Sequence, residues 1–175
     1  STYNLTIEPA TAFNKLHKKG KISLPNEDIQ YEMYETSIKT LENAGYRQYE
    51  ISNFSKPGME SKHNINYWKN GEYIGIGAGA SSYLKGERFK NTNLPGNYIR
   101  DIRTKANAIE TRERLEPIHA MGETLMLGLR LLKGVSIDAF ENRFQVSFQQ
   151  VYGKVLEPLL QQKLITFNRN SIALS

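Results

Sequence analysis

The stretch that decides how this chain is interpreted is residues 62–80, KHNINYWKNGEYIGIGAGA. Its first half holds a histidine and the only tryptophan of the chain, and its second half places four glycines in nine positions. HNINYW has helical spacing, so His63 and Tyr67, four residues apart, share one face. Asn64 and Trp68 share a neighbouring face for the same reason. Aromatic rings crowded beside a permissive backbone predict either a ligand site or a packed cluster.

The chemistry of these side chains admits both interpretations. A solvent-accessible His63 is suited to ligating a porphyrin iron, to acid–base work near neutral pH, or to donating a hydrogen bond. The rings of Tyr67 and Trp68 are suited to stacking on a planar aromatic ligand. The same residues can equally form a buried aromatic cluster around a hydrogen-bonded histidine. The motif by itself leaves both open.

The glycine run beside the motif has the spacing of a dinucleotide fingerprint. Gly75, Gly77 and Ala80 fit G-x-G-x-x-A, which needs a helix N-terminus directly after it to hold a pyrophosphate. The following SSYLKGERF contains Gly86 and the β-prone Tyr83, which disfavour a helix. We therefore expect a strand with glycines at alternate positions, whose bare face admits a flat ligand or a neighbouring backbone.

The composition of the whole chain limits the class of protein. Its 175 residues fit one large domain or one and a half small ones, and no apolar run approaches the roughly 18 residues of a membrane span. Cysteine is missing from the sequence, so this chain supplies no disulfide, thiolate zinc ligand or iron–sulfur ligand, which fits a cytoplasmic protein. The sequence opens without methionine and within a strand-like pattern, so we expect a piece of a longer protein.

The formal net charge of +5 is concentrated around the quoted stretch. Residues 53–107 carry nine lysines and arginines against four acidic residues, whereas residues 1–52 and 108–175 are close to neutral. A basic excess around an aromatic site indicates an anionic ligand such as a carboxylate, a phosphate or a nucleic acid, or else a solvated basic surface.

Hydrophobic spacing divides the chain into three regions, namely residues 1–54, 55–107 and 108–175. In the first region TYNLTIE (2–8) alternates like a strand, helices are expected over 11–19 and from about 25 to 45, and a second strand is expected over 46–54. Strand, helix and strand in that order predict a βαβ unit and hence a parallel sheet. The middle region adds a short helix after Pro95.

The third region predicts three helices closed by a β-hairpin. The helices are expected over 117–132, 137–143 and 148–162, and the hairpin turns at Asn168, Arg169 and Asn170. This is the outline of a winged helix. The eight basic and seven acidic residues of the region give it little charge with which to neutralise phosphates, so we expect protein docking or core capping rather than DNA binding.

Several motifs together resemble one known family. YEISNF (49–54), HNxxYW (63–68) and YIGIGAGASSY (73–83) are similar in sequence and order to the radical SAM family of oxygen-independent coproporphyrinogen III oxidases, and more closely to their HemW-type relatives, which are heme chaperones. LGLRLLKGV (127–135) follows in the order typical of that family. The resemblance covers essentially the whole chain.

The resemblance implies a fold that combines α/β and α+β parts. Residues 1–54 would be the βαβ end of a partial (β/α) radical SAM barrel, and residues 55–107 would complete the barrel edge. Residues 108–175 would be a mostly helical, winged-helix-like C-terminal domain. The family holds a [4Fe–4S] cluster on a CxxxCxxC motif that this chain lacks. The cluster and S-adenosylmethionine (SAM) would thus belong to the longer parent, and the fragment alone is expected to be inactive.

The resemblance also implies site residues. It places Asn4, Ala80 and Ser81 on the SAM side of the barrel. HNxxYW distinguishes the HemW type from the true oxidases and is associated with heme binding, which carries over to His63, Asn64, Tyr67 and Trp68. Porphyrin carboxylates would then account for the basic excess, with four candidate partners: Lys62, Lys69, Arg88 and Arg100.

The leading hypothesis is accordingly the C-terminal part of a heme chaperone that binds heme and passes it to client proteins. One alternative is an oxygen-independent coproporphyrinogen III oxidase, which decarboxylates two propionates in porphyrin biosynthesis. A second alternative is a winged-helix interaction module. A nucleic-acid partner is not expected.

Overall fold

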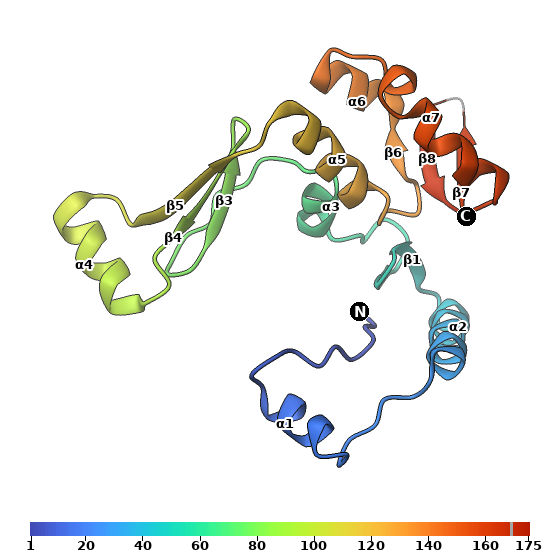
Figure 1. Ribbon diagram of the computed structural model, residues 1–175, viewed down its shortest axis with the longest axis horizontal. Coiled ribbons are helices and arrows are strands. Elements are labelled where there is room, and N and C mark those ends of the chain that lie inside the picture. The colour runs from blue at the N-terminus through green and yellow to red at the C-terminus, as the bar shows by residue number, and fades with distance from the viewer. Residues whose placement is uncertain (169) are drawn as a thin grey trace. The chain divides into compact units, whose positions relative to one another are not determined.

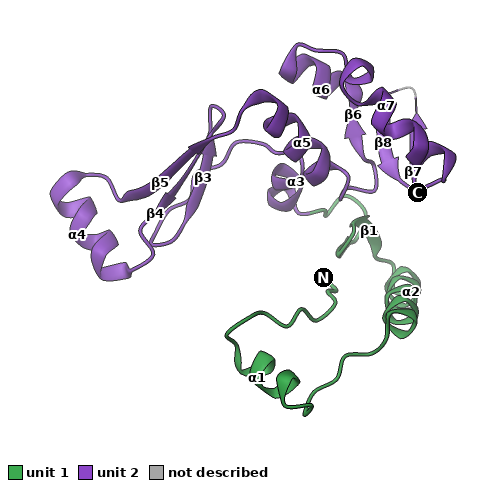
Figure 2. Ribbon diagram, in the orientation of Figure 1, with its two compact units in different colours: residues 1–60 green, residues 61–175 purple. Residues whose placement is uncertain are grey.

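The computed structural model describes residues 1–168 and 170–175 (Figure 1). The chain forms two compact units, residues 1–60 and residues 61–175 (Figure 2). Both mix helices with small sheets, and every strand pair among the described residues is antiparallel. None of the described helices is long and apolar enough to cross a membrane.

The helices of the first unit begin at polar caps. Helix α1 (Ala12–Lys18) starts where the Thr11 hydroxyl accepts a hydrogen bond from the Asn14 amide. Helix α2 (Glu27–Asn43) starts where the Asn26 side chain accepts one from the Ile29 amide. Such caps satisfy amides that lack a partner within the helix. Both helices agree with the pattern of the sequence.

The strands of the first unit differ from the expectation. Residues 46–54 do not form one strand but an antiparallel pair, β1 (Arg47–Glu50) and β2 (Asn53–Ser55). The buried Glu50 carboxylate accepts hydrogen bonds from the Ser52 amide and the Asn53 side chain, which stabilises the turn between them. The predicted strand at 2–8 is wrong. A strand needs a ladder of backbone partners, but the one ladder-type hydrogen bond of this segment among the described residues runs from the Thr2 amide to the Ser52 carbonyl. The predicted parallel βαβ unit is therefore absent from residues 1–168 and 170–175.

The second unit opens with helix α3 (Lys62–Trp68), as the sequence predicts. A three-stranded antiparallel sheet follows, made of β3 (Ser81–Leu84), β4 (Glu87–Asn91) and β5 (Ile109–Arg114) in that order. Helix α4 (Pro95–Lys105) connects β4 to β5 and confirms the helix predicted after Pro95. Strand β5 was not predicted, because its sequence IETRER is mostly charged and exposed.

The predicted glycine strand is wrong. Only an isolated bridge joins Tyr73 to β3, and the rest of the segment is irregular, with Gly77 and Gly79 at positive φ (111° and 71°). Gly75 is required for another reason: a Cβ there would collide with the carbonyl oxygen of Ser81. Strand β3 rather than a helix follows the glycines, so the segment lacks the helix N-terminus that a dinucleotide fingerprint needs.

The C-terminal part of the second unit packs three helices on a small sheet. Its elements are α5 (Pro117–Gly128), β6 (Val135–Ser136), α6 (Ile137–Phe144), α7 (Phe148–Gln161), β7 (Ile165–Asn168) and β8 (Ser171–Leu174). The strand order is β6-β8-β7. The core contains Met121, Val135, Phe140, Phe148, Leu156, Ile165 and Ile172. The predicted helices and hairpin are confirmed, although Arg169 of the expected turn lies outside the described residues.

Helix α5 ends four residues before the predicted end at residue 132. A Cβ on Gly128 would collide with the Val135 side chain, so this glycine lets β6 approach the helix. The amides of Arg130 and Leu131 then form turn hydrogen bonds to Leu127 and Gly128. The apolar period of the sequence runs through this turn, which explains why it suggested a longer helix.

Candidate functional site

Helix α3 orders the histidine and tyrosine of the motif. The Ser61 hydroxyl accepts a hydrogen bond from the Asn64 amide and fixes the start of the helix. His63 is exposed, and its ring stands edge-on to the half-buried Tyr67, with centroids 4.6 Å apart and planes at 81°. The four-residue spacing therefore places these two rings in contact, as predicted from the helical pattern.

A third ring extends this contact away from the helix. Tyr67 stands edge-on to Tyr73, with centroids again 4.6 Å apart and planes at 76°. Tyr73 is fixed in turn by two backbone hydrogen bonds to Tyr83 of β3, of 2.8 and 2.9 Å. We call His63, Tyr67 and Tyr73 the aromatic row. Edge-to-face contacts contribute about 0.5–1.5 kcal/mol each, so the row holds His63 in place without burying it.

Trp68 lies in a different environment. The guanidinium of Arg130 lies 4.4 Å above its ring. The indole Nε1 is buried and has no hydrogen-bond partner among the described residues. The Trp68 carbonyl also lies beside Gly128 at the end of α5. Trp68 therefore packs against the end of α5, whereas His63 and Tyr67 are part of the aromatic row.

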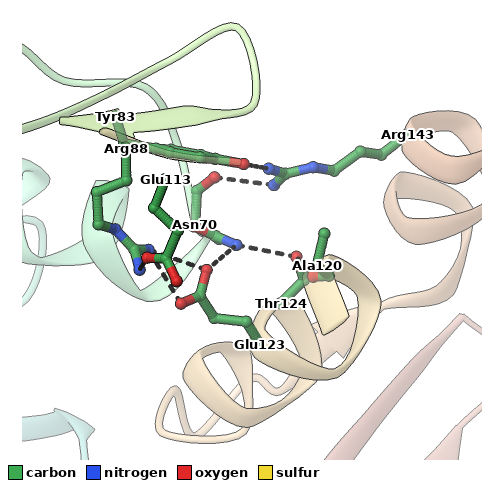
Figure 3. A network of polar contacts seen from close by, with 8 residues as sticks. All are labelled: Asn70, Tyr83, Arg88, Glu113, Ala120, Glu123, Thr124 and Arg143. Atoms are coloured by element: carbon green, nitrogen blue, oxygen red, sulfur yellow. Dashed lines mark hydrogen bonds and ion pairs between the residues drawn. The ribbon is translucent and has the colours of Figure 1, made fainter. Parts of the chain in front are cut away.

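A polar network joins the end of α3 to α5 and β4 (Figure 3). The buried Asn70 side chain donates to the Glu123 carboxylate (3.3 Å) and to the Thr124 hydroxyl (3.1 Å). The Arg88 Nη2 atom lies 2.9 Å from both Glu123 carboxylate oxygens. The Thr124 hydroxyl donates to the carbonyl of Ala120. Each buried polar group thus has a partner, which makes the network a rigid support for α3.

The aromatic row and the network meet at Arg88. Burial lowers the pKa of Arg88, but the hydrogen bond and charge of Glu123 raise it, and Tyr73 raises it further through its charge and a side-chain hydrogen bond, so that the net shift is upward. Ring contacts thus run from the exposed His63 through Tyr67 to Tyr73, and Arg88 is bonded to Glu123 on α5.

The structure divides the four candidate partners of a carboxylate into residues that already form an ion pair and residues that do not. Arg88 is already paired with Glu123, and Arg100 pairs with Asp101 at 3.1 Å. The hydrogen bond from Arg100 lowers the pKa of the Asp101 carboxyl, and the charges of Arg100 and Lys105 lower it further, although burial opposes the shift. Lys62 and Lys69 are exposed and form no ion pair among the described residues.

A cavity of about 700 Å³ opens beside this network. Its walls come from the segment after α3, the β3–β4–β5 sheet, the start of α5 and the end of α6. Arg143 of α6 reaches into this region and donates to the Asn70 carbonyl and to the Tyr83 hydroxyl, both at 2.8 Å. Figure 3 shows Arg143 extending toward Tyr83, with Asn70, Arg88 and Glu123 gathered next to it.

The residues predicted for the SAM side lie in different units. Asn4 lines a cavity of about 310 Å³ in the first unit together with Tyr34 and Ser52, and its side chain donates to Gln30 at 3.4 Å. Ala80 and Ser81 lie in the second unit, where Ser81 begins β3 opposite Lys90. The role of these three residues stays a prediction.

Sequence reasoning missed Tyr73, Asn70, Glu123 and Arg143 as parts of this site. The contacts of Asn70 with Glu123 and Arg143 join residues 53 and 73 positions apart. Local periodicity carries no information over such distances. The one available signal was the position of Asn70 and Tyr73 just beyond the motif.

Comparisons with known proteins agree on one family. Residues 115–175 match the HemN C-terminal domain. The chain is 43% identical to the heme chaperone HemW of Lactococcus lactis over 97% of its own length and 44% of that protein. It is 38% identical to the heme chaperone HemW of Bacillus subtilis over its full length and 46% of that protein. The chain thus spans about half the length of these relatives.

A solved structure shows the same fold. The coproporphyrinogen III oxidase (HemN) of Escherichia coli, a radical SAM enzyme, matches with a TM-score of 0.67 and 16% identity, over 91% of this chain and 41% of that one. At this identity the match is evidence for the fold alone. Together with the sequence relatives, it confirms the resemblance of the motifs: the chain is a member of the oxygen-independent coproporphyrinogen III oxidase-like radical SAM family, on its HemW-type branch, and corresponds to the C-terminal part of such a protein.

Proposed function

We propose that this chain is the C-terminal part of a cytoplasmic heme chaperone, which binds heme and delivers it to client proteins. The observation that carries the proposal is the state of His63: it is exposed, yet its ring is fixed edge-on by Tyr67. The chain is also 43% identical to a protein that is itself a heme chaperone.

The geometry of His63 suits a ligand of the heme iron. Its ring nitrogens form no hydrogen bond or ion pair among the described residues, so they are available for coordination. Tyr67 limits the ring orientation, which reduces the entropy lost when iron binds. An exposed ligand also suits a protein that must release its cargo. Trp68, packed under Arg130, supports the helix in this proposal, and Asn64 lies on its side of α3.

The parent protein would supply the remaining cofactor sites. Because this chain has no cysteine, the ligands of a [4Fe–4S] cluster would have to lie elsewhere in the parent. Asn4, Ala80 and Ser81 remain the residues proposed for the SAM side. We retain residues 1–54 as the end of a partial barrel and 55–107 as its edge. The order of helices and strands in 108–175, with sheet order β6-β8-β7, supports a winged-helix-like domain.

A heme titration of the 175-residue chain tests the proposal. His63→Ala should abolish the Soret shift or weaken heme binding at least about tenfold, since it removes the iron ligand. His119→Ala is the matched control, because His119 is exposed in the same unit but lies on α5. A Soret spectrum and affinity that are the same in wild type and in His63→Ala would refute the role of His63.

One second candidate function follows from the family, which includes oxygen-independent coproporphyrinogen III oxidases. The parent of this chain would then decarboxylate the propionates of a porphyrinogen. The full-length parent, incubated with coproporphyrinogen III and SAM, distinguishes the two. Decarboxylated product would favour the oxidase, and heme transfer without product would favour the chaperone. An interaction module built on residues 108–175 alone would instead bind a partner protein without heme.

A further inference from the structure

The cavity beside α3 has the size of a small-molecule site. Its volume of about 700 Å³ falls within the range of roughly 300–1,000 Å³ typical of ligand pockets. Aromatic and charged groups face it together, among them Tyr83, Phe144, Arg88 and Arg143. All of these residues belong to the second unit.

Arg143 differs from Arg88, a second arginine of the cavity wall, in how its charge is balanced. Both of its hydrogen bonds go to neutral oxygens, the Asn70 carbonyl and the Tyr83 hydroxyl. Its guanidinium also lies 5.4 Å from the Phe144 ring and 5.9 Å from the Tyr83 ring. No carboxylate among the described residues lies within ion-pair distance of it, whereas Arg88 is paired with Glu123.

The guanidinium of Arg143 is preorganised to bind an anion. Two neutral acceptors and two rings fix the guanidinium, so little side-chain entropy remains to be lost on binding. The planar fork has five N–H donors, and the two hydrogen bonds leave others available. A carboxylate matches this fork in shape and charge, and the nearby rings favour a ligand that is itself planar and apolar.

The acidic residues of the cavity restrict where an anion can sit. Glu72, Glu113 and Glu116 also line it. Glu113 lies 3.9 Å from Arg88, and Glu72 accepts a hydrogen bond from the Lys85 amide. The charge of Glu113 disfavours a carboxylate beside Arg88, which leaves Arg143 as the more favourable position.

The cavity is connected to the proposed heme site by short contacts. Asn70, whose carbonyl Arg143 contacts, lies two residues beyond the end of α3. The aromatic row links His63 to Tyr73, and the backbone of Tyr73 is hydrogen-bonded to Tyr83, the other partner of Arg143. Resting on the proposed function, we propose that this cavity binds a propionate carboxylate of the porphyrin and that Arg143 is the residue that holds it.

Titrations of hemin and of hemin dimethyl ester into the 175-residue chain test this assignment. The ester carries a methyl group on each propionate and therefore lacks both of their negative charges. Wild type should bind hemin about tenfold more tightly than the ester, because one charge-assisted contact is lost. Arg143→Gln should remove this preference by weakening hemin alone. Arg103→Gln, an exposed arginine on α4, should preserve it.

Two further variants separate binding from folding. Tyr83→Phe removes one hydrogen bond of Arg143 but keeps its charge, so the preference for hemin should survive. If Arg143→Gln weakens hemin and the ester equally, Arg143 is structural and the inference is overturned. If wild type binds both ligands equally and His63→Ala abolishes both, the inference fails while the proposed function stands. If wild type binds neither, both fail.

Discussion

Replacing Glu123 by glutamine should destabilise the second unit by about 2 kcal/mol. Arg88 Nη2 lies 2.9 Å from both oxygens of this carboxylate, whose side chain is 18% exposed, and Arg88 itself is 33% exposed. Removing one partner of a fully buried ion pair costs about 3–5 kcal/mol. Water reaches a third of Arg88 and screens the charge left behind, so the cost should fall below that range. The glutamine retains an acceptor for Asn70.

Urea unfolding followed by the fluorescence of Trp68 measures this loss, because Trp68 is the single tryptophan and lies in the second unit. The double variant Arg88→Met/Glu123→Gln should recover about 1 kcal/mol relative to the sum of the single variants. Glu157→Gln, at an exposed position of α7, is the control. A coupling energy near zero, or a loss no larger than in the control, would refute the claim that this pair supports α3.

Two other changes probe backbone packing and a buried hydroxyl. Gly75→Ala should cost about 1–3 kcal/mol, since its Cβ would meet the Ser81 carbonyl, whereas Gly96→Ala, which has open space, should cost little; equal melting temperatures would contradict this. Burial raises the pKa of the Tyr152 phenol, and its hydroxyl has no partner among the described residues. The folded state therefore holds the phenol proton more tightly than the unfolded chain does. The contribution of this proton to folding stability is complete below pH about 10 and is lost as the pH rises above it. Tyr152→Phe should be at least as stable as wild type at pH 7 and lose less stability between about pH 9 and 11 in urea titrations; a steeper loss would contradict the assignment.

The elements predictable from the sequence are those that local chemistry determines. Thr11, Asn26 and Ser61 each cap the helix that follows them, and each cap bond spans only three residues. Strands depend on partners elsewhere in the chain. Residues 2–8 have a strand-like pattern without a ladder, while IETRER forms β5 because β4 lies beside it.

In the candidate site, too, contacts between residues close in sequence were predictable and contacts between distant residues were not. Helical spacing correctly placed His63 beside Tyr67, four residues away. It gives no indication that Arg88 is paired with Glu123, 35 residues away, so the sequence alone leaves Arg88 among the candidate partners of a carboxylate. Charge counts locate a basic region, but only the fold shows which of its charges are already balanced.

The HNxxYW motif therefore combines two separate tasks on one short helix. His63 and Tyr67 belong to a face that is partly open to solvent and ends in the aromatic row. Trp68 belongs to a face that packs under Arg130 against the end of α5. Substitutions at His63 should accordingly change ligand binding with little effect on folding, whereas substitutions at Trp68 should act through the stability of α3. We therefore propose that the His63 face bears the ligand and that the Trp68 face holds the helix, a division that these two sets of substitutions test.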